Sequence, residues 1–206
     1  MADIKNIVLD IGNVLGHFCW EKVFTDIMGI KGEEFERLAD CTVRSDMWSE
    51  LDKSLLSDEQ VMENCIKLDK SQEKNIREFF THLGEVVIDF DYSRKWINEL
   101  KQEGFKVYIL SNYGKTSFTS CRERGNLSFI EDVDGAVISY EVKLCKPDVE
   151  IYEALLSKYD LKAEECLFFD DLIKNVEGAR KAGMKAKLFT TYEAAREVIA
   201  GINISE

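Results

Sequence analysis

The stretch Val8-Leu9-Asp10-Ile11-Gly12-Asn13-Val14 places a carboxylate and a glycine directly after a short apolar run. The residues before Asp10 are apolar from Ile7 onward, with no polar residue between them. An unbroken apolar run bounded by polar residues is typical of a strand whose two faces are both buried, as in a parallel sheet. We therefore interpret residues 7–9 as a parallel strand that ends at Asp10.

Similar apolar runs recur along the chain and predict further strands of the same sheet. They lie at residues 107–110, 135–138 and 166–169, with a weaker one at 186–189. Helical patterns separate them, at residues 92–102, 147–159 and 175–182. This alternation predicts an α/β fold built on a doubly wound parallel sheet. We expect residues 1–16 and 92–206 to form this core domain.

Residues 17–91 break the alternation, because their patterns are helical only. Apolar residues follow helical spacing in residues 20–28 and again in residues 33–39. Ser57 and Gln60 have the spacing of a capping box, which predicts a helix that starts after Ser57. We expect residues 17–91 to form an inserted all-helical cap domain over the carboxyl edge of the sheet, where open α/β sheets bind ligands.

Polar residues follow each of the four main predicted strands. They are Asp10 and Gly12 after the first strand, Ser111 and Asn112 after the second, Lys146 after the third, and Asp170 and Asp171 after the fourth. Each type alone is common in turns, helix caps or surfaces. Because parallel strands end at the same edge of a sheet, we expect the whole set to meet in one crevice.

Three carboxylates in one crevice predict a bound cation. Their mutual repulsion requires neutralisation, and oxygen ligands with room for water and phosphate oxygens suit Mg²⁺. A carboxylate beside the metal can attack phosphorus and form an aspartyl-phosphate, which water then hydrolyses. The Ser111 hydroxyl and the Asn112 backbone N–H can donate to phosphoryl oxygens, and Lys146 supplies positive charge.

In this order the motifs resemble those of the haloacid dehalogenase (HAD) superfamily, which combines a Rossmann-like core with a cap. The resemblance spans almost the whole chain and rests on residues 8–14, Leu110-Ser111-Asn112, Cys145-Lys146-Pro147-Asp148 and Phe168-Phe169-Asp170-Asp171. The form Asp-x-Gly-Asn-Val in the first motif is similar to the branch that includes bacterial glucose-1-phosphate phosphatase and to the N-terminal phosphatase of soluble epoxide hydrolase.

The resemblance implies a magnesium-dependent phosphatase that acts on a small phosphorylated metabolite, such as a sugar phosphate. Asp10 would be the nucleophile and Lys146 a second catalytic residue. The groups that would bind the phosphoryl moiety are Ser111, Asn112 and Lys146. The implied metal ligands are Asp10, the Gly12 carbonyl, Asp171 and Asp170, the last either directly or through a metal-bound water.

Gly12 departs from the usual pattern of the superfamily's phosphatases, which carry a second Asp two positions after the nucleophile as general acid and base. The Gly12 carbonyl can still bind a metal, but the proton for the leaving group needs another source. General acid-base assistance contributes about 10² to 10⁴-fold. We therefore expect either a preference for good leaving groups or a proton from water or from a residue of the cap. A glycine at this position would also permit a positive φ.

Other functions remain open on the same motifs. A 2-haloacid dehalogenase also lacks that second Asp, but it needs no magnesium and leaves the pair Asp170 and Asp171 unexplained. A catalytically weak HAD fold that serves as a binding module is another alternative. A phospho-acceptor receiver domain is disfavoured, because there the acid pair follows the first strand and no large helical insertion is present.

Composition and charge restrict the partners. The chain has 206 residues and a net charge of -12, with no basic stripe, so we expect no nucleic-acid partner. No apolar run approaches the roughly 20 residues of a membrane span, and the first residues do not resemble a signal peptide. We expect a cytoplasmic protein without a membrane partner, either a monomer or a homodimer.

The remaining reactive side chains suggest no second site. The six cysteines are scattered and only two histidines are present, so a zinc site is not expected and the cysteines are interpreted as reduced core residues. His17 could touch the substrate from the hinge but is interpreted as a structural histidine. Trp48 could point from the cap toward the site but is interpreted as a core residue of the cap.

Overall fold

The protein, described here by a computed structural model over residues 3–203, contains a five-stranded parallel sheet in the order β5-β4-β1-β6-β7. The first strand, β1 (Asn6–Leu9), lies at the centre. It pairs with β4 (Lys106–Ser111) on one side and with β6 (Cys166–Asp170) on the other. The edge strands are β5 (Gly135–Ile138) and β7 (Lys185–Leu188). The predicted α/β fold with a parallel sheet is confirmed.

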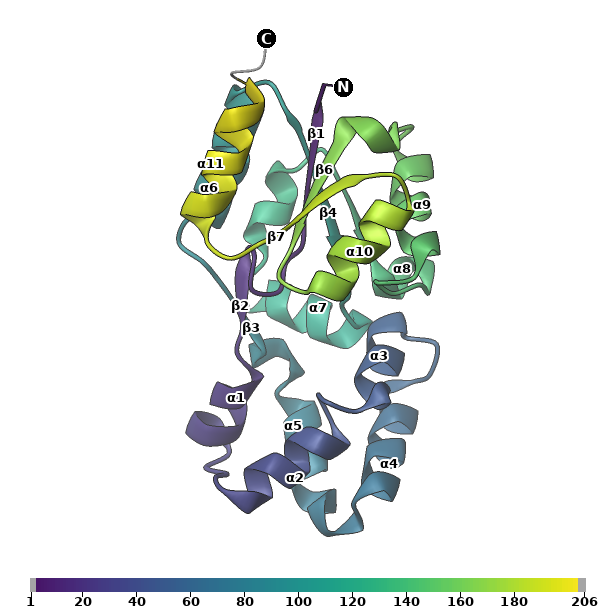
Figure 1. Cartoon of the computed structure of the whole chain (residues 1–206). Coiled ribbons are helices and arrows are strands. Elements are labelled where there is room, and N and C mark those ends of the chain that lie inside the picture. Colours follow the sequence, from purple (N-terminus) through teal and green to yellow (C-terminus); the bar gives the residue numbers. More distant parts are fainter. Residues whose placement is uncertain (1–2, 204–206) are drawn as a thin grey trace.

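Helices cover both faces of the sheet, which explains why its strands are continuously apolar (Figure 1). Along β1, Leu9 belongs to the hydrophobic core on one face and Val8 to the core on the other. The first core includes α6 (Ser93–Gln102) and α11 (Tyr192–Asn203), and the second includes α9 (Val149–Lys158) and α10 (Ile173–Lys181).

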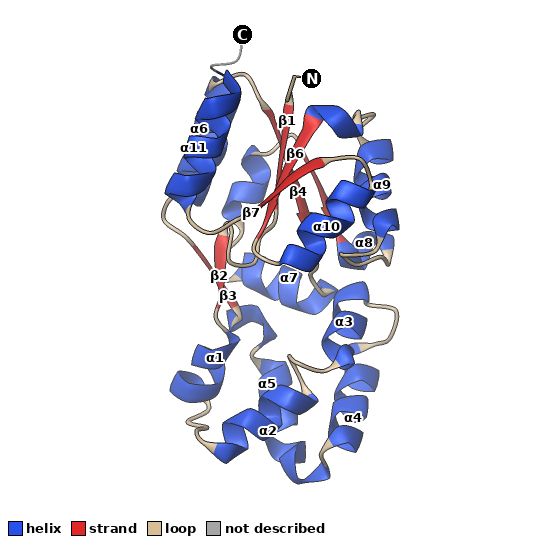
Figure 2. Ribbon diagram, in the orientation of Figure 1, coloured by secondary structure: helices blue, strands red, loops and turns tan. Residues whose placement is uncertain are grey.

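Residues 17–91, which we call the helical segment, are attached to the sheet through a two-stranded antiparallel ribbon (Figure 2). The ribbon consists of β2 (Gly16–Phe18) and β3 (Val87–Asp89). These strands correct the expectation that the segment is helical only. Each has three residues, too few to show the period-two alternation by which a strand is recognised in a sequence.

The rest of the helical segment consists of short helices packed around aromatic side chains. They are α1 (Trp20–Lys22), the π-helix η1 (Val23–Ile27), α2 (Glu33–Cys41), α3 (Asp46–Lys53), α4 (Asp58–Leu68), η2 (Lys70–Gln72), α5 (Glu73–Thr81) and η3 (Leu83–Glu85). The predicted capping box at Ser57 and Gln60 is present at the start of α4. The rings of Phe24 and Phe79 pack edge to face in the centre of these helices, with their centroids 4.9 Å apart.

The remaining elements connect the strands of the core. They are α7 (Lys115–Glu123), η4 (Ser128–Asp132), α8 (Ser139–Val142) and η5 (Ala163–Glu165). All six cysteines are buried and unpaired, as expected for reduced core residues. Among residues 3–203, no helix combines the length and the apolar character that crossing a membrane requires.

Candidate functional site

The pairing of the central strands brings the first, second and fourth motifs together. Leu9 of β1 is aligned with Ile109 of β4 and with Phe169 of β6. Asp10, one residue further, therefore lies between the ends of these two neighbouring strands, where Ser111 and Asp170 stand. The Ser111 hydroxyl lies near the Asp10 carboxylate and lowers the pKa of that group. The expected meeting of these residues at the carboxyl edge of the sheet is observed.

Lys146 reaches this edge from the loop after α8 and bridges two of the carboxylates. Its Nζ lies 2.7 Å from Asp10 Oδ1 and donates to Asp170 Oδ2, also at 2.7 Å. Its side chain is 1% exposed, so the charge is fully desolvated. Although burial opposes it, the two adjacent carboxylates hold the pKa of Lys146 above its ordinary value. Lys146 is therefore a fixed ammonium group in the floor of the site.

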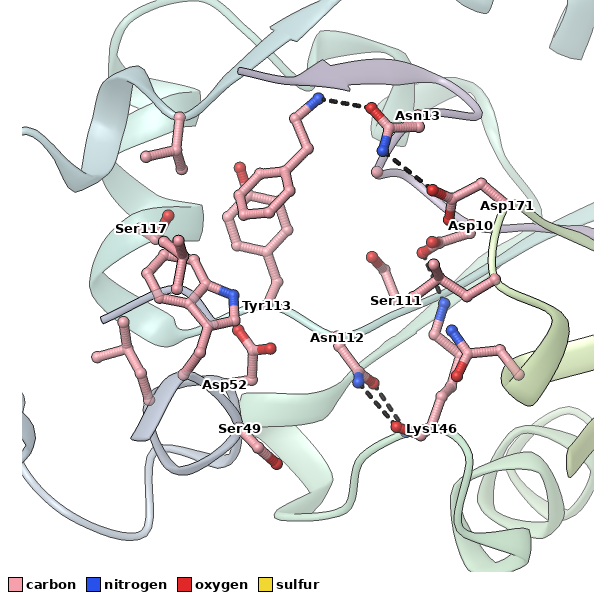
Figure 3. Close-up of a pocket in the computed structure, with 18 of the residues that line it drawn as sticks. Asp10, Asn13, Ser49, Asp52, Ser111, Asn112, Tyr113, Ser117, Lys146 and Asp171 are labelled. Atoms are coloured by element: carbon pink, nitrogen blue, oxygen red, sulfur yellow. Dashed lines mark hydrogen bonds and ion pairs between the residues drawn. The ribbon is translucent and has the colours of Figure 1, made fainter. Parts of the chain in front are cut away.

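Asn112 positions Lys146 through a reciprocal pair of hydrogen bonds. The Lys146 backbone N–H donates to Asn112 Oδ1 at 2.8 Å, and Asn112 Nδ2 donates to the Lys146 carbonyl at 3.0 Å (Figure 3). The peptide bond from Lys146 to Pro147 is cis. Within the described residues, the backbone N–H of Asn112 has no hydrogen-bond acceptor. The side chain of Asn112 thus fixes the Lys146 loop, while its backbone N–H remains available to donate a hydrogen bond to a ligand.

Asp170 is completely buried, and both of its carboxylate oxygens are already engaged. Oδ1 accepts from the Leu172 N–H and from Asn175 Nδ2, both at 2.9 Å. Oδ2 accepts from Lys146 and from the same Asn175 group at 3.1 Å. Two acceptor contacts at each oxygen fill its usual capacity. Asp170 therefore anchors Lys146 and Asn175.

Asp171 lies beside Asp10 and Asp170 and has fewer hydrogen-bond partners than Asp170. Its Oδ2 accepts from Asn13 Nδ2 at 2.9 Å (Figure 3). Burial raises the pKa of Asp171, although the bond from Asn13 opposes this shift. The carboxylates of Asp10, Asp170 and Asp171 offer ligand oxygens that all lie within 4.8 Å of one another. Three carboxylates against the one ammonium of Lys146 leave an excess of two negative charges, which a divalent cation would neutralise.

Burial also governs the charge of Asp10. Desolvation raises the pKa of this carboxyl, and nearby Asp170 raises it further. Lys146 and the Ser111 hydroxyl act in the opposite direction by stabilising the carboxylate. A second cation beside Asp10 would favour the ionised form that a nucleophile requires.

A cavity of about 460 Å³ opens above these groups, between the sheet edge and the helical segment. Every predicted site residue except Asp170 lines it. The helical segment and the ribbon supply much of the opposite wall, including Phe18, Trp48, Asp52 and Val87. Trp48 corrects the sequence interpretation in part, because it lines the cavity as well as packing on Phe79, with ring centroids 6.1 Å apart. His17 is not a lining residue; its ring stacks on Phe90.

Gly12 has space around it. Its φ lies outside the left-handed region, so the backbone does not require glycine here. A Cβ at this position would lie 3.9 Å from Asp10 Oδ2 and 4.0 Å from the Phe18 Cβ, which are ordinary contacts. No hydrogen bond from residues 3–203 reaches the Gly12 carbonyl. A β-carbon at position 12 would therefore cause no clash.

Asp52 is the buried acid of the cavity that the sequence analysis did not identify. It stands near the end of α3, is 7% exposed, and its carboxyl group lies near the Gly114 backbone N–H, which favours the ionised form. Its neighbours Leu51 and Lys53 give the sequence no recognisable motif. The amphipathic pattern of α3 marks a buried face, but only the packing of α3 on the core shows that this face borders the cavity.

Comparisons with known proteins identify relatives of this chain. A family model described as haloacid dehalogenase-like hydrolase matches residues 4–183. A protein of Mycobacterium tuberculosis named as a phosphatase is 29% identical over 196 residues, which are 90% of this chain and 87% of that protein. A sesquiterpene phosphatase of Aspergillus oryzae is 36% identical over 89 residues, which are 43% of this chain and 44% of that one.

The fold also matches solved structures. One is a HAD family enzyme of Bacteroides thetaiotaomicron in complex with magnesium and inorganic phosphate. The match has a TM-score of 0.71 and 21% sequence identity, and it covers 92% of this chain and 96% of that chain.

Proposed function

Because the chain belongs to the haloacid dehalogenase-like hydrolase family, we propose that it is a magnesium-dependent phosphatase that cleaves a small phosphate monoester through an aspartyl-phosphate on Asp10. The observation that carries this proposal is the cluster of three carboxylates at the carboxyl edge of the sheet, two of which contact one buried ammonium. This arrangement suits a divalent cation and a phosphoryl group together. Relatives named as phosphatases support the same reaction class.

The metal would be held by oxygen atoms alone. Asp10, the Gly12 carbonyl and Asp171 have acceptor capacity left, whereas the oxygens of Asp170 are filled by hydrogen bonds. We therefore assign the first three groups as ligands and Asp170 as the residue that keeps Lys146 in place. When bound, Mg²⁺ would neutralise the carboxylates and polarise the phosphoryl oxygens.

The chain's own residues would perform the remaining tasks. Asp10 would attack phosphorus, since its carboxylate lies at the cavity floor beside Lys146. The Lys146 ammonium, the Ser111 hydroxyl and the free Asn112 N–H would hold the phosphoryl oxygens, where negative charge collects in the transition state. Fixed donors of this kind need no reorganisation during the reaction.

We propose that residues 17–91 act as the cap domain and select the substrate. The cavity volume of about 460 Å³ is in the range of small-molecule sites. Its wall combines the aromatic rings of Phe18 and Trp48 with the polar side chains of Ser45 and Ser49. A sugar phosphate fits this combination, because aromatic faces pack on sugar rings while polar groups bind the hydroxyls.

A phosphate-release screen across a panel of metabolites tests the proposal. We expect turnover of at least one phosphate monoester with Mg²⁺ and none with excess chelator. The Asp10→Asn variant, whose amide keeps the shape but cannot attack phosphorus, serves as the control. Halide release from a 2-haloacid without metal, with no phosphate release, would favour the dehalogenase instead.

A further inference from the structure

We propose that Asp52 of the helical segment is the general acid and base of the reaction, in place of the carboxylate that is missing at position 12. This proposal rests on the proposed phosphatase function. Asp52 would supply the leaving-group proton, for which the sequence shows no donor at position 12.

The first observation is the position of Asp52. It lines the same cavity as Asp10, and Figure 3 shows its carboxylate across the cavity from Asp10, on the side of Asn112. It is 7% exposed, and its carboxyl group lies near the Gly114 N–H. Within residues 3–203, no lysine, arginine or histidine forms an ion pair with it. A buried carboxyl without a counterion is costly in the ionised form, which favours a group that carries a proton.

The second observation is that Asp52 is held rigidly against the core. Ser139 Oγ donates to the Asp52 carbonyl at 2.8 Å, and Lys143 Nζ donates to the Ser54 carbonyl at 2.8 Å. A Cβ on Gly114 would lie 2.8 Å from the Leu51 carbonyl oxygen, so only glycine allows this approach. Gly114, which α3 contacts, lies in the loop that directly follows Ser111 and Asn112 in the chain. The place of Asp52 is therefore coupled to the residues that would hold the phosphoryl group.

The third observation concerns the charges around Asp52. Burial raises the pKa of this carboxyl to about 7; Lys146 opposes the shift and Asp10 adds to it. The other titratable groups that interact with it are the Cys145 thiol and the Tyr113 hydroxyl. Burial holds the pKa of both above their ordinary values, so they stay neutral near pH 7. A carboxyl that titrates near neutrality can donate a proton in one step and accept one in the next.

No other lining residue fits this role equally well. Beyond Asp52 and the groups already assigned to metal and phosphoryl binding, the ionisable residues of the cavity are Arg44, Asp46, Tyr113 and Lys174. Burial raises the pKa of the Tyr113 hydroxyl well above its ordinary value, which makes it a poor acid near pH 7. The other three are exposed. Arg44 is also paired with Glu36 at 2.6 Å and cannot act as an acid near neutral pH.

The proton balance of both steps closes with Asp52 alone. In the first step, an Asp10 oxygen forms a bond to phosphorus, the bond from phosphorus to the leaving oxygen breaks, and that oxygen takes the Asp52 proton. In the second step, the Asp52 carboxylate takes a proton from water, the water oxygen bonds to phosphorus, and the bond to Asp10 breaks. The products are the alcohol and inorganic phosphate, and Asp52 is protonated again.

The test compares Asp52→Asn with wild type on two substrates in the presence of Mg²⁺. The substrates are p-nitrophenyl phosphate, whose leaving group needs no proton, and an alkyl phosphate, whose leaving group does. Asparagine keeps the shape and an acceptor for the Gly114 N–H. Glu50→Gln is the matched control, because Glu50 is an acid of the same helix that pairs with Lys53 at 3.2 Å and does not line the cavity.

We expect kcat/KM of Asp52→Asn to fall about 10² to 10⁴-fold on the alkyl phosphate and less than about tenfold on the aryl phosphate. The decline of wild-type kcat/KM on the alkyl phosphate as pH rises through the pKa of Asp52 should be absent in the variant. Activity on the aryl phosphate also shows that the variant is folded. Equal losses on both substrates, or no loss on either, would overturn the role of Asp52. A wild-type enzyme that releases phosphate neither from these two substrates nor from any monoester of the metabolite panel would overturn the proposed function itself.

Discussion

Replacement of Lys146 by Met should destabilise the metal-free protein strongly, because it leaves the carboxylates of Asp10 and Asp170 buried without their cation. The variant keeps an apolar stem of similar volume but removes the ammonium that lies 2.7 Å from both Asp10 and Asp170. At this distance each pair contributes about 6 kcal/mol of Coulomb energy for an effective dielectric constant near 20, and desolvation cancels much of it. Breaking a buried ion pair on one side typically costs about 3–5 kcal/mol. We expect a loss of this size in the free energy of unfolding at pH 8.

The dependence of this stability loss on Mg²⁺ and pH distinguishes the lost charge of Lys146 from the lost packing of its stem. Mg²⁺ should stabilise the variant more than wild type, because it supplies positive charge to the same carboxylates. Without Lys146, the pKa of Asp10 is expected to rise further above its value in the unfolded chain. The folded state then binds more protons, so the deficit of the variant should shrink as pH falls from 8 to about 5.5.

Denaturant unfolding of both proteins, with and without Mg²⁺ and at both pH values, measures these differences. Lys181→Met, at an exposed position of α10, is the control and should change stability by less than about 0.5 kcal/mol. A deficit of Lys146→Met that is the same under all four conditions would refute the electrostatic interpretation, since it would mean that the lost contacts of the stem dominate.

Four further predictions follow from the site. Asp10→Asn should lower kcat at least about 100-fold with an unchanged circular dichroism spectrum, and smaller losses would place the nucleophile elsewhere. Excess chelator should abolish phosphate release from wild type, whereas undiminished turnover would contradict the metal site. Gly12→Asp should raise kcat/KM of Asp52→Asn on alkyl phosphates, because position 12 is open; no gain would show that this position cannot supply the proton. Because the pKa of Asp52 is raised from about 4 to about 7, the folded state binds its proton more tightly, so wild type should lose stability relative to Asp52→Asn as pH rises from 4 to 8 in urea unfolding.

The sequence predicted the centre of the molecule well for a physical reason. Parallel strands buried on both faces are recognisable as apolar runs, and their common direction brings the residues after them to one edge. Thus Asp10, Ser111 and Asp170 could be placed together without a structure. The sequence predicts a role for the Asn112 N–H, but it does not predict that the Asn112 side chain fixes the Lys146 loop, because that contact joins residues 34 positions apart.

The opposite wall of the cavity could not be predicted in the same way. The ribbon strands β2 and β3 are short, and their pairing joins residues far apart in the chain. Asp52 follows Leu51 in a helix whose sequence shows only amphipathic spacing. Its burial results from the approach of α3 to Gly114, a tertiary contact that local sequence does not encode. The same holds for Trp48, whose aromatic character alone does not distinguish core packing from a cavity wall.

Chemical trapping of the covalent intermediate tests whether Asp10 is the nucleophile. The protein would be mixed with a substrate found in the screen and Mg²⁺, quenched in acid, and reduced with borohydride, which converts an aspartyl-phosphate into homoserine. Peptide mass spectrometry then identifies the modified residue. We expect homoserine at position 10, formed only when both substrate and Mg²⁺ are present. Phosphate release without modification of Asp10, or modification at another aspartate, would contradict this expectation.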